Sequence, residues 1–79
     1  MPRMRIGTTD LERLEAALVS HTIATDGYDT VTVTPAMWQA AGTDRQASFR
    51  TVANVFRLRV KIGNADEPPS LDASADRPG

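Results

Sequence analysis

The stretch SFRTVANVFRLRVKIG, residues 48–63, decides the fold because its hydrophobic period changes in the middle. Its first half repeats apolar residues at positions i, i+3, i+4 and i+7, which is typical of one face of an α-helix. Its second half alternates apolar and basic residues, which is typical of a strand with one buried face. The stretch therefore predicts a helix that leads directly into a strand. Its expected core residues are Phe49, Val52, Ala53, Phe56, Leu58, Val60 and Ile62.

Upstream of this stretch, the spacing of apolar residues predicts a helix over residues 10–23 and a strand over residues 30–34. In the helix, leucines recur at helical spacing behind a capping box formed by Thr9 and Glu12. In the strand, valine alternates with threonine, and both residue types favour extended backbone. A weaker alternation near the N-terminus predicts a short first strand.

Two helices are expected after this strand, over residues 35–41 and 43–56. Thr34 followed by Pro35 is typical of a helix start, and Gly42 interrupts the helical pattern. The elements then follow in the order (β)-α-β-α-α-β. This order predicts a small α+β domain whose helices pack on one face of a two- to three-stranded sheet.

The composition changes again after the last expected strand. Residues 64–79 are rich in proline, aspartate and serine and contain a single leucine. Such a segment buries too little apolar surface to offset the entropy lost when a chain becomes ordered. We therefore expect a folded domain over residues 1–63 and a disordered acidic C-terminal tail over residues 64–79.

Length and composition limit the classes of protein. With 79 residues the chain is long enough for one domain. It contains no cysteine, which excludes disulfides and thiolate zinc sites. It has no apolar run near the roughly 20 residues of a membrane span, and its first residues lack the apolar stretch of a secretory signal. These properties predict a cytoplasmic protein without a membrane partner.

The residues that catalysis requires are not arranged in any known pattern. His21 is the only histidine, and no nucleophile is placed to pair with it. No set of residues has the spacing of a metal site or of a phosphate-binding loop. We therefore expect no enzymatic activity, no catalytic residue, no metal and no cofactor.

Charge is distributed unevenly along the chain. The net charge is −1, yet residues 43–63 carry five basic residues against one acidic residue. A basic segment of this kind predicts an anionic partner such as nucleic acid, although an ordinary solvated surface can have the same composition. Arginine and asparagine are also side chains that read base edges in the major groove. Six residues are the candidates for nucleic-acid contacts: Arg45, Arg50, Asn54, Arg57, Arg59 and Lys61.

A resemblance to a known family supports the same interpretation. VTPAMWQAAG, residues 33–42, resembles the entry into the second helix of a winged helix-turn-helix domain, and DRQASFRTVANVFR, residues 44–57, resembles its recognition helix. The domain would be truncated, because no wing strand is expected after Gly63. The resemblance implies DNA contacts by Arg45, Arg50, Asn54 and Arg57.

The run SFRTVANVFRLRVK is also similar to a segment of small uncharacterised proteins from actinobacteria and their phages. We therefore expect a small DNA-binding or DNA-associated accessory or regulatory protein of phage or actinobacterial type, which contacts duplex DNA through residues 45–61. The alternative is a protein-binding module, such as a phage-type inhibitor of a host protein or an interaction domain that forms a homodimer. The exposed edge of a small sheet motivates this alternative.

Overall fold

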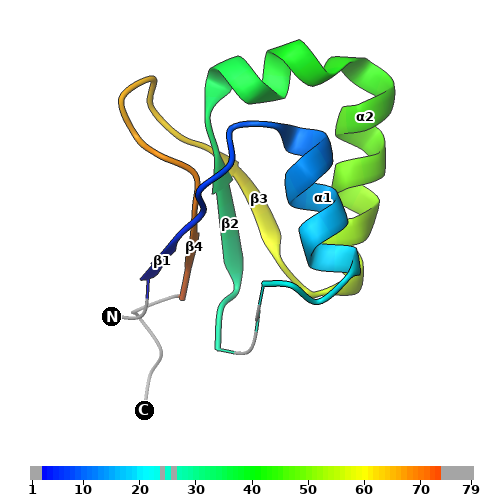
Figure 1. The fold of residues 1–79 in the computed structure, drawn as a ribbon, viewed down its shortest axis with the longest axis vertical. Coiled ribbons are helices and arrows are strands. Elements are labelled where there is room, and N and C mark those ends of the chain that lie inside the picture. Colours follow the sequence, from blue (N-terminus) through cyan, green and yellow to red (C-terminus); the bar gives the residue numbers. More distant parts are fainter. Residues whose placement is uncertain (1–2, 24, 26, 74–79) are drawn as a thin grey trace.

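The chain folds into a four-stranded mixed sheet with two helices against one of its faces (Figure 1). A computed structural model describes residues 3–23, 25 and 27–73. The predicted α+β class is confirmed. The elements are β1 (Arg3–Arg5), α1 (Leu11–Val19), β2 (Thr30–Val33), α2 (Pro35–Val55), β3 (Arg59–Ile62) and β4 (Ser70–Asp72).

The strand order across the sheet is β1-β4-β2-β3, so β1 and β3 are its two edges. β2 and β3 run parallel, with Thr30 opposite Arg59 and Val33 opposite Ile62. Parallel neighbours require a crossover connection, and α2 provides it. β4 runs antiparallel to both β1 and β2.

The expected disordered tail contains one of the two central strands, so the prediction is wrong for β4. Leu71 is fully buried, and β4 pairs with a strand on each side. Backbone hydrogen bonds continue this pairing, since Ile6 N donates to Pro69 O at 2.9 Å and Asp29 N donates to Asp72 O at 3.0 Å. The sheet therefore has four strands, not two or three, and the domain extends beyond Gly63. Residues 74–79 of the expected tail lie outside the described residues.

α1 is shorter than the helix expected over residues 10–23, because it ends at Val19. His21 follows with a left-handed backbone, φ 59°, which stops the helix. The His21 ring lies edge-on to the ring of Phe56, with 5.6 Å between the ring centroids. Although His21 lies beyond α1, its side chain therefore contacts the end of α2. The N-cap is Asp10 rather than Thr9, and its Oδ1 accepts a hydrogen bond from Glu12 N at 3.0 Å.

α2 consists of two helical segments that meet at Gly42, as predicted. Thr34 caps the first segment, and its Oγ1 accepts from Met37 N at 3.1 Å. Gln46 Nε2 donates to Trp38 O at 2.8 Å and so joins the two segments across the bend. Figure 1 shows the first segment crossing the end of the sheet and the second descending beside α1.

The bend depends on the backbone of Gly42, whose φ of 86° and ψ of 166° lie in a region that almost only glycine occupies. We expect Gly42→Ala to lower the free energy of unfolding by about 1–3 kcal/mol. The cost is purely conformational, because a Cβ at this position would meet no atom within 4 Å. Urea denaturation followed by circular dichroism measures it.

Gly7→Ala is the matched control, since Gly7 has equal space for a Cβ and does not adopt a positive φ. It should leave stability unchanged or raise it by less than about 1 kcal/mol. Equal stabilities for the two variants would show that Gly42 is not required for the bend.

The core lies between the helices and the sheet and is formed by Ile6, Leu11, Leu14, Leu18, Val31, Val33, Met37, Phe49, Ala53, Leu58 and Leu71. Of the core residues expected from the opening stretch, Phe49, Ala53 and Leu58 are buried. Val52, Phe56 and Val60 are partly buried against the core. The expectation for Ile62 is wrong, because this residue is 41% exposed at the end of an edge strand.

Candidate nucleic-acid interface

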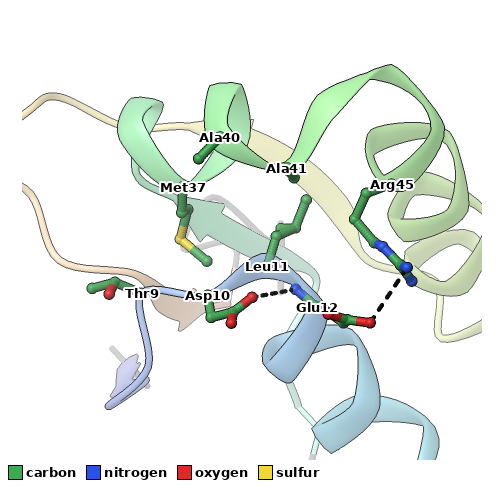
Figure 2. Close-up of a pocket in the computed structure, with 8 residues that line it drawn as sticks. All are labelled: Thr9, Asp10, Leu11, Glu12, Met37, Ala40, Ala41 and Arg45. Carbon is green, nitrogen blue, oxygen red and sulfur yellow. Dashed lines mark hydrogen bonds and ion pairs between the residues drawn. The ribbon is translucent and has the colours of Figure 1, made fainter.

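Arg45 is set apart from the other candidate residues because it faces α1. Its guanidinium lies 3.4 Å from Glu12 Oε2 and 4.0 Å from Glu15 Oε1 (Figure 2 draws the first pair). Ser48 Oγ donates to Glu15 Oε2 at 2.9 Å one turn further along α2. Arg45 and Ser48 therefore join α2 to α1, and the charge of Arg45 is already balanced by carboxylates.

A pocket of about 500 Å³ lies beside this ion pair, between the start of α1 and the bend of α2 (Figure 2). Leu11, Met37 and Ala41 contribute apolar lining, and Asp10 and Glu12 contribute carboxylates. Both carboxylates have partners, because one caps α1 and the other pairs with an arginine. Among the described residues, no group of three His, Cys, Asp or Glu side chains could hold a metal ion.

Two candidate residues, Arg50 and Asn54, lie on the outer flank of α2, and a third, Arg57, follows the end of the helix. Arg50, Asn54 and Arg57 are spaced i, i+4 and i+7, and all are exposed. Ser48, which contacts α1, is about 160° around the helix from Arg50 at 3.6 residues per turn. This flank therefore faces away from α1.

Arg50 is held in place by an aromatic ring. Its guanidinium carbon lies 5.2 Å from the centroid of Trp38, in cation–π geometry. The Trp38 ring in turn meets the ring of Phe49 edge-on at 6.3 Å. Trp38, which precedes the bend, therefore links the core to an exposed cation. Sequence spacing could not show this contact, because the break at Gly42 changes the helical register.

Arg57 occupies the left-handed position that ends α2, with φ 60°. Its N–H donates to Asn54 O at 3.0 Å, and Leu58 N donates to Ala53 O at 2.8 Å, which is the Schellman pattern of hydrogen bonds. Glycine usually fills this position because an L side chain is strained there. His21 has the same conformation at the end of α1, and its ring meets the ring of Phe56 edge-on.

Arg59 and Lys61 lie on β3, on the sheet face that points away from the helices. Register places them beside Thr30 and Thr32, while Val60 between them packs against the core. Both side chains are exposed. We call the exposed set Arg50, Asn54, Arg57, Arg59 and Lys61 the basic strip.

The basic strip contains five of the six candidate residues: two on α2, one just after its end and two on β3. In the described part of the chain, none of its four cations forms an ion pair, whereas Arg45 pairs with two carboxylates. Among the described residues, the four cations of the strip therefore have no carboxylate within ion-pair distance.

One polar cluster was not expected from the sequence, because two of its three residues belong to β4. Thr32 and Ser70 are buried at the centre of the outer sheet face. The Oδ2 atom of Asp72 accepts hydrogen bonds from Thr32 Oγ1 at 3.3 Å and from Ser70 Oγ at 3.2 Å. These bonds satisfy the two buried hydroxyls, so the cluster has a structural explanation.

Comparison of the chain with family models, curated proteins and solved structures gives no significant match. The resemblance to winged helix-turn-helix domains therefore stays a prediction from the sequence. Within residues 3–23, 25 and 27–73, no helix has both the length and the apolar character needed to cross a membrane.

Proposed function

We propose that this protein is a small DNA-binding accessory or regulatory protein that holds duplex DNA with the basic strip. The observation that carries the proposal is a difference in ion pairing among the basic candidate residues. Arg45 is balanced by carboxylates, whereas Arg50, Arg57, Arg59 and Lys61 are exposed and have no carboxylate partner among the described residues. Phosphates would supply the missing counter-charge.

The dimensions of the strip suit a nucleic-acid backbone. Arg50 and Asn54 are four residues apart on α2, which corresponds to about 6 Å along its axis, and Arg57 follows just beyond the end of the helix. Arg59 and Lys61 lie about 7 Å apart on β3, which runs back in the opposite direction from the second segment of α2 (Figure 1). These cations can contact several phosphates, and phosphate contacts position a protein without reading sequence. Asn54, between two arginines, is the side chain best suited to contact a base edge.

The backbone strain at Arg57 also supports the proposal. A glycine at this position would end α2 with less strain, and no ion pair or ring contact of Arg57 in the described structure accounts for the arginine. Strained residues are common at functional sites, where the side chain serves a purpose other than stability. In this protein that purpose would be contact with a phosphate.

The first test is a titration of the protein with duplex DNA at several salt concentrations. Trp38 is the only tryptophan and contacts Arg50, so its fluorescence reports on the strip directly. With four cations engaged, the slope of log K against log salt should be about −3.6. Arg50→Glu combined with Arg57→Glu should abolish binding.

Arg13→Glu is the control, because it changes the net charge by the same amount per substitution on α1, outside the strip. It should leave most of the affinity in place. Absence of binding at low salt would overturn the proposal, and so would an equal loss of affinity in Arg13→Glu and Arg50→Glu.

A second test separates the contribution of Arg57 to stability from its contribution to binding. Arg57→Gly should raise the free energy of unfolding by about 1 kcal/mol, because glycine adopts the left-handed conformation without strain. The same variant should weaken DNA binding and reduce the salt slope by about 1. Urea denaturation and the fluorescence titration measure the two effects. A variant that is more stable and binds DNA equally well would contradict the role assigned to Arg57.

A further inference from the structure

The outer edge of β3 offers backbone groups to a partner. Arg59 N donates to Asp29 O at 2.9 Å and Gly63 N donates to Val33 O at 2.8 Å, so these amides face β2. Because successive amides of a strand point to opposite sides, those of Val60 and Ile62 face the free edge. β3 is the last strand of the sheet, and three of its four residues are exposed.

The side chains around this edge differ on its two faces. Arg59 and Lys61 are exposed on the outer face, without an ion pair in the described part of the chain. On the helix side Ile62 is 41% exposed, and Val60 is only partly buried. An added strand would therefore meet cations on one face and apolar surface on the other.

A second copy of the chain is a poor occupant for this edge. Antiparallel pairing of two β3 strands about Val60 would place Arg59 of each copy directly opposite Lys61 of the other. Like charges at directly opposite positions destabilise a pair of strands. Edge lysines protect native sheets from self-pairing in this way. The same two cations attract a strand of opposite charge.

We propose that the β3 edge binds an extended acidic segment of a partner protein as a fifth strand of the sheet. The segment would alternate carboxylate and β-branched residues. Its carboxylates would pair with Arg59 and Lys61, its apolar side chains would cover Ile62, and its backbone would bond to Val60 and Ile62. The proposal is independent of DNA binding, although a bound acidic strand would compete with DNA for Arg59 and Lys61.

The experiment uses the full chain without DNA and a blocked heptapeptide of alternating glutamate and valine. Amide exchange measured by NMR should slow about tenfold or more at Val60 and Ile62, since both amides would become hydrogen-bonded (tenfold corresponds to about 1.4 kcal/mol). The exchange of the Arg59 amide, which already faces β2, should change little. A blocked heptapeptide of alternating lysine and valine should have no effect.

Two variants distinguish backbone pairing from simple charge attraction. Ile62→Pro removes an amide that faces the edge and should abolish binding of the acidic peptide while DNA affinity is retained, because no charge changes. Arg59→Glu with Lys61→Glu should reverse the preference, so that the lysine–valine peptide binds and the acidic one does not. This double variant keeps the proposal testable if the proline variant does not fold.

Three results would overturn the proposal. The first is an acidic peptide that leaves the exchange of Val60 and Ile62 unchanged. The second is equal protection of both amides by the two peptides. The third is concentration-dependent protection of the same amides without peptide, which would identify a second copy as the occupant. None of these results bears on DNA binding, which Arg50→Glu tests separately.

Discussion

Leu71→Asp is expected to unfold the domain. Leu71 is fully buried in β4, between β1 and β2, and its backbone partners are Met4 and Val31. A carboxyl group there would be buried in an apolar core without a partner, whether charged or protonated, or the sheet would have to open. Either outcome costs a large part of the free energy of unfolding of a domain of this size, since 79 residues correspond to roughly 4–12 kcal/mol in total.

Leu71→Ala provides the graded version of the same experiment. It should lower the free energy of unfolding by about 2–5 kcal/mol through lost burial and the cavity left behind. Val55→Ala is the control, because Val55 is 71% exposed, and it should change stability by less than about 0.5 kcal/mol. Urea denaturation followed by circular dichroism measures all three variants. A folded Leu71→Asp protein would show that β4 does not belong to the stable sheet.

Phe49→Ala is expected to have the second largest effect, a loss of about 3–5 kcal/mol of stability. Phe49 is the largest of the fully buried side chains and lies on the second segment of α2. Its ring also meets Trp38 of the first segment edge-on, so it fixes the two segments relative to each other. Its loss removes core volume and the ring contact that supports the bend.

The consequence for the basic strip can be measured in the same sample. Without the Phe49 ring, Trp38 should become more exposed, and the emission of this single tryptophan should shift to longer wavelength under native conditions. Phe49→Leu keeps apolar volume and should cost less than about 1.5 kcal/mol. A Phe49→Ala protein with unchanged stability and unchanged emission would contradict the place given to Phe49 in the core.

Local periodicity accounts for the parts of the fold that the sequence predicted well. The alternation around Val31 and Val33 and the helical stripe that contains Phe49 and Ala53 were both read correctly, because each repeats over several residues. The glycine at position 42 was also a reliable signal, since its backbone freedom is a property of the residue itself.

The errors have a common physical cause. β4 is three residues long and contains one apolar side chain, so it has no period to detect. It is stabilised by hydrogen bonds to β1 and β2, which lie far away in the sequence. Ile62 follows the alternation of β3 but remains exposed, because it lies at the end of an edge strand.

For the candidate interface too, some properties follow from local sequence and others depend on the tertiary structure. The sequence by itself determined that Arg50 and Asn54 share one helix flank, because 3.6 residues per turn brings them into line, whereas Arg57 lies beyond the end of the helix. It also determined that Arg59 and Lys61 share one strand face. Only the tertiary structure decided that Arg45 is balanced by α1 and that β3 is an edge. Those properties depend on which distant segments pack together, and no local pattern encodes them.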